Sequence, residues 1–299
     1  MSVDLSRRSL LAASLSTAVA LPLARVFAQT ADTGPVASLA ALERRHGGQL
    51  GVAVLDTVGG RRINHRGEER FPMCSTFKWL AAAQVLARVD RGEERLDRRV
   101  VFDAKDLVPY SPVTEKHTGA PGMTIAELCD AAVTLSDNTA GNLLLASFGG
   151  PAALTAFVRS IGDTRTRLDR IEPELNEALP GDPRDTTTPA AMLGDLRELL
   201  LGDALSPVSR AQLTAWLVAN KTGDARLRAG VPAEWRVGDK TGTGNRGATN
   251  DVAILWPPGR GPLLVAAYYI DAVGATPEQR SAVLADVGRI VAGLVRPHA

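Results

Sequence analysis

Signatures of metal and redox chemistry are missing from this chain. Its histidines and cysteines are few and scattered, namely His46, His65, His117, His298, Cys74 and Cys129. There is no Cys-x-x-Cys pair and no His-Glu-x-x-His helix, the patterns on which dithiol and many zinc enzymes depend. We therefore expect neither a metal nor a cofactor.

The chain also lacks a charge imbalance. Its 34 basic and 33 acidic residues leave a formal net charge of +1, which gives no reason to expect a nucleic-acid or membrane-surface partner. With 299 residues, 45% hydrophobic and 4% aromatic, the composition is that of an ordinary globular protein. The length suits one large domain or two intertwined ones, and we expect a monomer.

An uncharged apolar run over residues 10–24 follows the pair Arg7-Arg8. It leads to Val26-Phe27-Ala28, with small residues at the first and third positions, as signal peptidase requires. Residues 1–28 are thus predicted to be an export signal of the twin-arginine type. A signal-anchor helix is the alternative, but the run is short for a bilayer span. We expect a periplasmic or secreted protein with no stable membrane association after processing.

Strand patterns occur at both ends of the remaining chain, and helical patterns fill the middle. Apolar runs predict strands at 50–56, 61–65, 235–240, 251–256 and 263–270. Three- and four-residue spacing predicts a helix after Ser75 that ends near Gly92, and others near 124–132, 138–147, 151–161, 189–201, 206–220 and 277–295. The expected fold class is α/β plus all-α, with an antiparallel sheet flanked by terminal helices and an inserted helical subdomain.

This order of elements also predicts the domain organisation. Residues 29–66 and 221–299 should form an α/β domain and residues 67–220 a helical domain, with the active site at their interface. The stretch 162–188 has no convincing period and carries Asp, Pro, Gly and Thr. A loop of that length inside a compact domain is usually functional.

The first candidate motif is Ser75-Thr76-Phe77-Lys78, at the start of a predicted helix. Residues i and i+3 are neighbours on a helix, so Ser75 and Lys78 share a face. A serine hydroxyl needs a base within reach to act as a nucleophile, and a lysine held neutral by its surroundings can serve. Backbone N–H groups at a helix N-terminus can also stabilise an oxyanion. Alone, the pair could equally be a helix cap with a solvated lysine.

Three further segments carry candidate chemistry. Ser136-Asp137-Asn138 precedes a predicted helix, where all three residue types also favour simple capping. Lys240-Thr241-Gly242 ends a predicted strand, where an edge lysine followed by a turn is the structural alternative. Glu172-Pro173-Glu174-Leu175-Asn176 lies in the aperiodic loop and could be no more than a solvated acidic turn.

Taken together, these segments resemble the class A serine β-lactamases, in which Ser-x-x-Lys, Ser-Asp-Asn and Lys-Thr-Gly recur. The resemblance covers essentially the whole mature chain. Further matches are Tyr110-Ser111-Pro112-Val113-Thr114-Glu115-Lys116-His117, the loop from Arg170 to Asp185, and Lys240-Thr241-Gly242-Thr243-Gly244. The resemblance implies a β-lactamase/transpeptidase-like fold and hydrolysis of the β-lactam amide bond of penicillins and cephalosporins.

The same resemblance implies catalytic roles. Ser75 would attack the lactam carbonyl, and the backbone N–H groups of Ser75 and Thr243 would hold the oxyanion. Ser136 would pass a proton to the departing nitrogen, with Lys78 and Lys240 shaping the proton's path.

Two steps of base catalysis are implied as well. Whether Lys78 or Glu172, acting through a water, accepts the first proton stays open. Glu172 and Asn176 would then hold and activate a water that hydrolyses the ester, and such general-base help contributes about 10²–10⁴-fold.

The residues implied in substrate binding are Tyr110, Asn138, Asn176, Arg226, Thr241, Gly242 and Thr243. Many family members place an arginine on the strand after Lys-Thr-Gly, where this chain has Thr249. Arg226 matches a position from which other members supply that guanidinium, although it could also be a surface arginine. Asn138 would bind the substrate's side-chain amide, and Tyr110 would form an aromatic wall of the cleft.

Arg170 and Asp185 bracket the aperiodic loop, and a charge pair between them would close the loop and position Glu172. The cysteines are less informative. In some relatives Cys74 pairs with a cysteine at the position of Gly244, and Cys129 with one at the position of Ala82, so neither bridge can form here. A bridge between Cys74 and Cys129 is conceivable, but we expect both to be small buried hydrophobic residues.

Two other classes of protein remain open. A D,D-peptidase or transpeptidase would acylate on the same Ser75, but the segment Glu172–Asn176 counts against it. A non-enzymatic lactam sensor would acylate and stay acylated. Turnover of a chromogenic cephalosporin separates the lactamase from both.

Overall fold

The computed structural model describes residues 34–295. They belong to one compact unit that begins at Thr33. The export signal predicted at 1–28 lies outside the described residues. The division of the mature chain into two domains at residues 66 and 220 also stays a prediction.

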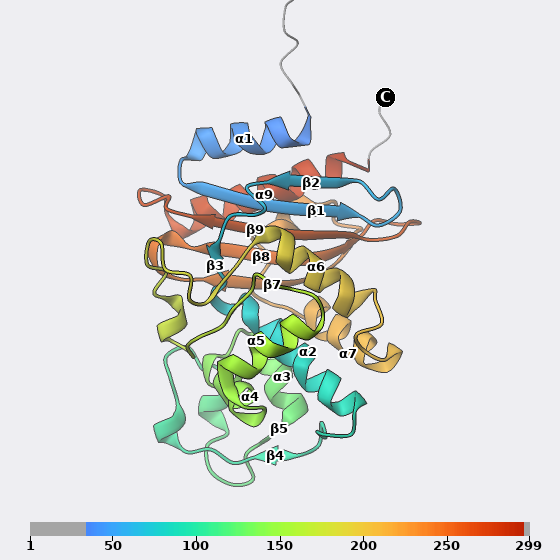
Figure 1. Ribbon diagram of the computed structural model, residues 1–299. Coiled ribbons are helices and arrows are strands. Elements are labelled where there is room, and N and C mark those ends of the chain that lie inside the picture. The colour runs from blue at the N-terminus through green and yellow to red at the C-terminus, as the bar shows by residue number, and fades with distance from the viewer. Residues whose placement is uncertain (1–33, 296–299) are drawn as a thin grey trace, which may run out of the picture. The chain divides into compact units, whose positions relative to one another are not determined.

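A five-stranded antiparallel sheet is built from both ends of the chain, as expected (Figure 1). Its spatial order is β2, β1, β9, β8, β7. The strands are β1 (Gln49–Asp56), β2 (Arg62–His65), β7 (Arg236–Thr243), β8 (Thr249–Trp256) and β9 (Leu263–Ile270). The central pairing joins β1 to β9, with Val52 opposite Ala267.

The two faces of the sheet carry separate hydrophobic clusters, because side chains alternate along a strand. On β9, Leu263, Val265, Ala267 and Tyr269 pack on one face, and Leu264, Ala266, Tyr268 and Ile270 on the other. The first face is covered by α1 (Pro35–His46), α8 (Leu227–Gly230) and α9 (Pro277–Gly293). The second face meets the helical part of the chain (Figure 1).

That helical part places the site. It contains α2 (Phe77–Asp90), α3 (Ile125–Thr134), α4 (Asn138–Ser147), α5 (Gly150–Ser160), α6 (Pro189–Leu200) and α7 (Pro207–Val218). Every residue of α2 from Phe77 to Ala87 is buried, which is typical of a helix in the centre of a core. Gly92 follows this helix with a φ of +74°, a conformation that suits glycine at a helix end.

The structure differs from the sequence-based prediction at the end of one strand and within the long loop. The strand expected to end at Lys240 continues to Thr243, because Thr241 and Thr243 pair with Asp251 and Thr249 of β8. The stretch 162–188 is not wholly irregular, since it contains the 3-10 turn η4 (Glu174–Asn176) and the short strand β6 (Thr186–Thr187). Strand β6 pairs with β3 (Phe71–Pro72), just before the Ser75 segment.

Two minor strands, β4 (Arg99–Val100) and β5 (Met123–Thr124), pair at the far end of the helical part. Within residues 34–295, no single helix is long and apolar enough to cross a membrane; only α4 and α5 taken together, bent by 74°, meet that test by length and composition.

Candidate active site

Ser75 lies in the 3-10 turn η1 (Cys74–Thr76), which leads directly into α2. Its neighbour Cys74 has a φ of +46°, a conformation that residues other than glycine rarely adopt. Lys78 is one turn further along, and its Nζ donates to Ser75 Oγ at 2.9 Å. The spacing of three residues therefore brings the two groups together as the sequence predicts.

Lys78 is the centre of the polar cluster although it is completely buried. Its Nζ donates to the carbonyl of Ser136 at 2.8 Å and to Asn138 Oδ1 at 2.6 Å. It also lies 3.0 Å from Glu172 Oε1. Burial lowers the pKa of Lys78, and the adjacent Glu172 carboxylate opposes part of that shift. A lysine with a lowered pKa can accept a proton from a hydroxyl.

Glu172 reaches this cluster from the long loop and is only 1% exposed. Its Oε1 accepts a hydrogen bond from Ser75 Oγ at 3.1 Å, and its Oε2 accepts one from Asn176 Nδ2 at 2.5 Å. The contact with Ser75 is direct, whereas the sequence interpretation expects a bridging water for the base.

A residue that the sequence analysis missed holds the backbone of Glu172. Asn142 Oδ1 accepts from the Glu172 N–H at 2.9 Å, and Asn142 Nδ2 donates to the Glu172 carbonyl at 2.9 Å. The peptide bond that follows, Glu172–Pro173, is cis. Asn142 comes four residues after Asn138 on α4, so the two share a helix face. That spacing is the signal that could have found it.

Ser136 and Lys240 form the opposite wall. Lys240 Nζ donates to Ser136 Oγ at 3.0 Å and to the Thr241 carbonyl at 2.9 Å. Burial, and then the positive charges of Lys78 and Arg226, hold the pKa of Lys240 well below its ordinary value.

Asp137 fixes the Ser136 segment. It caps α4 by accepting from the Ala140 N–H at 2.8 Å, and it accepts from the N–H groups of Val113 and Thr114 at 2.9 Å each. Buried charge held by several N–H groups makes a rigid support. Ser136 itself has a φ of +59°.

A cavity of about 420 Å³ opens onto Ser75 and Ser136. It is lined by Ser75, Tyr110, Ser136, Asn138, Asn176, Thr222, Arg226, Thr241, Gly242 and Thr243. All seven residues that the resemblance implies in binding are therefore gathered here. Tyr110 is 61% exposed at the rim. Thr222 was not foreseen; its hydroxyl lies 2.5 Å from that of Thr241.

Arg226 is half-buried and lines this cavity. Its Nη1 donates to the carbonyls of Gly242 and Asn250, and its Nη2 donates to Thr243 Oγ1 at 2.7 Å. These bonds fix a guanidinium beside the end of β7, close to Thr249, where the sequence lacks an arginine.

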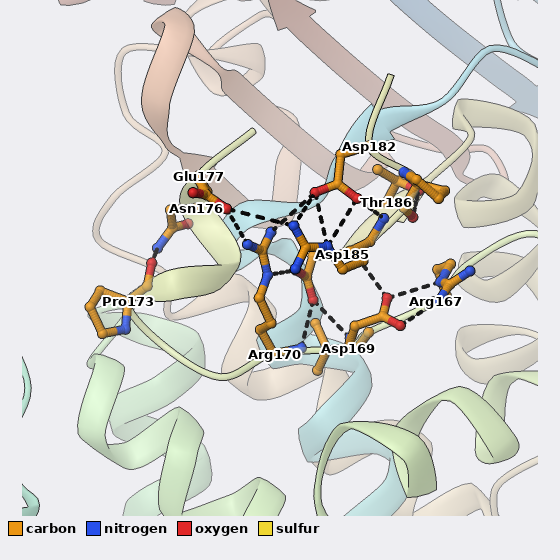
Figure 2. A network of polar contacts seen from close by, with 12 residues as sticks. Arg167, Asp169, Arg170, Pro173, Asn176, Glu177, Asp182, Asp185 and Thr186 are labelled. Carbon is orange, nitrogen blue, oxygen red and sulfur yellow. Dashed lines mark hydrogen bonds and ion pairs between the residues drawn. The ribbon is translucent and has the colours of Figure 1, made fainter. Parts of the chain in front are cut away.

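The loop that carries Glu172 is closed by the expected charge pair. Figure 2 shows Arg170 among several carboxylates, with its Nε donating to Asp185 Oδ2 at 2.6 Å. The other oxygen of Asp185 accepts from the N–H groups of Asp169 and Arg170 at 2.8 and 2.9 Å. Arg170 also pairs with Glu177. The two ends of the loop are thereby joined.

Both cysteines are free and buried, as expected of small hydrophobic residues. Burial raises the pKa of both thiols. A Cβ added to Gly244 would lie 2.6 Å from Cys74 Sγ, so glycine permits the end of β7 to contact the Ser75 turn. No group of three or more side chains suited to a metal ion occurs among residues 34–295.

Several known proteins are similar to this chain over most of its length. The model of the beta-lactamase enzyme family matches residues 35–295. Beta-lactamase L2 of Stenotrophomonas maltophilia is 50% identical over 95% of this chain and 96% of its own length. Beta-lactamase CTX-M-8 of Citrobacter amalonaticus is 47% identical over 97% of both chains. Among solved structures, an ancestral class A beta-lactamase is 69% identical, with a TM-score of 0.85 over 87% of this chain and 99% of that one.

The chain therefore belongs to the beta-lactamase enzyme family. Within that family it is a serine enzyme of class A, with the fold of its structural relatives.

Proposed function

We propose that this enzyme hydrolyses the lactam amide of penicillins and cephalosporins through an ester on Ser75. The observation that carries the proposal is the contact of Ser75 Oγ with two basic groups at once, Lys78 Nζ at 2.9 Å and Glu172 Oε1 at 3.1 Å. A hydroxyl between an amine and a carboxylate can lose its proton as it attacks a carbonyl.

In acylation, Ser75 Oγ forms a bond to the lactam carbonyl carbon, and its proton passes to the Lys78–Glu172 pair. The backbone N–H groups of Ser75 and Thr243 stabilise the oxyanion. The carbon–nitrogen bond then breaks. The nitrogen takes a proton from Ser136 Oγ, which Lys240 contacts at 3.0 Å. The proton removed from Ser75 returns to Ser136 Oγ by way of Lys78, so Lys78, Glu172 and Ser136 end the step in the protonation states in which they began.

In deacylation, Glu172 and Asn176 hold a water and Glu172 takes its proton as the water attacks the ester carbonyl. The ester bond to Ser75 Oγ then breaks, and Glu172 gives the proton to that oxygen, with which it is in contact. The products are the ring-opened acid and the regenerated Ser75 hydroxyl, and Glu172 is again free to act as a base. This step distinguishes the proposed enzyme from a D,D-peptidase or a lactam sensor, because a buried carboxylate within reach of Ser75 supplies the base for it.

Substrate binding follows from the cavity. The carboxylate of the antibiotic would bind among Lys240, Thr241, Thr243 and the fixed guanidinium of Arg226, since cations and hydroxyls favour it there. Asn138 would bind the side-chain amide, and Tyr110 would close one side of the cavity.

Mixing the purified mature protein with a chromogenic cephalosporin tests the proposal. Many turnovers per enzyme molecule are expected. A stoichiometric burst without turnover would instead indicate a peptidase or a sensor.

We also propose that the enzyme is exported through its twin-arginine signal and works as a monomer, periplasmic or secreted, without stable membrane association. Cell fractionation tests the route: replacing Arg7 and Arg8 by lysine should leave activity inside the cytoplasm. Export of that variant at the normal level would contradict the proposed signal.

A further inference from the structure

Three segments that are distant in sequence meet at Arg246. This residue lies in η5 (Asn245–Gly247), the turn between β7 and β8. Its Nη1 donates to the carbonyl of Ala178 at 2.8 Å, and its Nη2 donates to Asp271 Oδ2 at 2.5 Å. The Asp271 N–H in turn donates to the Arg246 carbonyl at 3.0 Å. One side chain therefore joins the Glu172 loop to the ends of β7 and β9.

The backbone at this junction is in an unusual conformation at all three points. Ala178, Arg246 and Asp271 have φ values of +53°, +54° and +66°. Residues other than glycine rarely adopt such values, and they persist where surrounding contacts hold them. Side-chain bonds from Arg246 are the contacts that link the three.

Ala178 is buried and packs in the hydrophobic core, and Arg246 adds a polar link to its carbonyl. A cavity of about 330 Å³ lies beside it, lined in part by Ala178, Leu179, Asp182, Arg246 and Asp271. Leu179, which follows Ala178, is 46% exposed beside this cavity. The hydrogen bond from Arg246 to Ala178 therefore adds to the restraint on this part of the loop.

The restrained segment is next to the proposed deacylating groups. Ala178 follows Asn176 by two residues, and Asn176 Nδ2 donates to Glu172 Oε2. On the other side, Arg246 follows Thr243, one of the proposed oxyanion donors, by three residues. The two segments are already in close contact, because a Cβ on Gly244 would lie 3.1 Å from the Asn176 carbonyl.

We propose that Arg246 is a positioning residue for deacylation. It fixes the Ala178 end of the loop against the end of β7, and so keeps Asn176 and Glu172 at the distance from the ester that water attack requires. Arg246 does not touch the reacting atoms. This inference rests on the proposed function of Glu172.

The test compares Arg246→Gln with the parent enzyme on a chromogenic cephalosporin. Glutamine is too short to bind both partners. We expect kcat and KM to fall together by about 3- to 10-fold, the effect of losing one or two hydrogen bonds, with kcat/KM unchanged within about 2-fold. Slow deacylation lowers both constants without changing kcat/KM, which reports acylation. A Ser75 ester should accumulate in the intact mass, and Arg246→Lys should recover part of kcat.

Arg260→Gln is the matched control. Arg260 also lies in a turn between strands, and it pairs with Asp56 at 2.5 Å with a side-chain exposure of 24%, against 31% for Arg246. Its loss should leave kcat and KM at the parent values. Asp271→Asn, which keeps Arg246 but weakens its ion pair, should shift both constants in the direction of Arg246→Gln and by less.

A parental kcat in Arg246→Gln, or a fall in kcat/KM without ester accumulation, would overturn the inference. Glu172→Gln serves as the reference that separates the two proposals. If Glu172→Gln accumulates ester and Arg246→Gln does not, only the inference fails. If Glu172→Gln turns over at the parental rate, both the proposed function and the inference fail.

Discussion

Lys78 Nζ and Glu172 Oε1 lie 3.0 Å apart, with both side chains fully removed from solvent. Lys78 comes from the first turn of α2, and Glu172 comes from a loop much later in the chain, 97 residues after Ser75. A buried ion pair costs desolvation energy that its own attraction scarcely offsets. Its presence beside Ser75 is therefore better explained by chemistry than by stability.

Replacing Glu172 by glutamine should stall the reaction after acylation. The amide cannot take a proton from water, so kcat for a cephalosporin should fall by about 10²–10⁴-fold. Intact mass spectrometry should show the Ser75 ester persisting. Glu174→Gln is the matched control, since Glu174 belongs to the same loop but its side chain is exposed, and it should retain parental turnover. Rapid turnover by Glu172→Gln would exclude the assigned role.

Asp185→Asn should loosen the loop and slow ester hydrolysis. The substitution removes the charge opposite Arg170 and replaces one of the two accepting oxygens by an NH2 group, so either the bond from Arg170 Nε or the two backbone N–H bonds lose their acceptor. Such a change costs about 2–4 kcal/mol. Steady-state kinetics should show a lower kcat. Asp182→Asn tests the specificity of the effect, because Asp182 lies 4.0 Å from Arg170 and should matter less. Equal rates in Asp185→Asn and the parent would count against a positioning role for the pair.

The alkaline limb of kcat/KM should move when Lys240 becomes arginine. Burial and two neighbouring cations lower the pKa of Lys240, so its charge is lost as the pH rises through a value below the ordinary lysine pKa of roughly 10.4. The substrate carboxylate then loses a partner, and kcat/KM falls. Arginine stays protonated, so Lys240→Arg should extend the plateau to higher pH. An unmoved limb would assign it to another group.

Asp195→Asn should raise stability at neutral pH. Burial, and then the nearby Asp163, raise the pKa of Asp195 well above its ordinary value. The folded protein thus holds a proton that the unfolded chain releases. The stability linked to this group is complete below the unfolded pKa of about 3.9 and is lost as the pH rises toward the folded pKa. Asparagine has no proton to lose, so its advantage in melting temperature should grow from pH 4 to pH 8.

Asp97→Asn provides a control of opposite sign. A hydrogen bond from Arg95 lowers the pKa of this exposed carboxyl, so its contribution is present above the unfolded pKa and is lost as the pH falls. Asp97→Asn should therefore lose a little stability at pH 7 and none near pH 3. If Asp195→Asn follows the same pH dependence as Asp97→Asn, the carboxyl of Asp195 is ionised in the folded protein.

Local relationships in the site could be predicted from the sequence, whereas long-range ones could not. The contact of Ser75 with Lys78 follows from helix geometry alone. The spacing from Asn138 could have placed Asn142 on the helix face that borders the site. Its hydrogen bonds to Glu172, like the link from Arg246 to Ala178, depend on the path of a loop that has no period. Family resemblance placed Arg226 where spacing offered no signal.

The fold shows the same division. Strands β1, β8 and β9 each contain a clear apolar run, and the sequence predicts their bounds within two residues. No bounds could be predicted for α1, since only Leu39 and Leu42 of its side chains are buried and such a narrow stripe gives a weak pattern. The end of β7 was predicted three residues too early, because the polar residues Thr241 to Thr243 resemble a turn in sequence. Pairing with β8 keeps them in the sheet.

The sheet serves both hydrophobic clusters at once. On β9, consecutive residues such as Leu264 and Val265 belong to opposite clusters. Unfolding of the helices on one face would expose strands on which the cluster of the other face also packs. We therefore expect that neither cluster stays folded without the other. A single heat-absorption peak is the calorimetric consequence, and the cavity beside Ser75 should vanish in that same transition, without an earlier loss of activity.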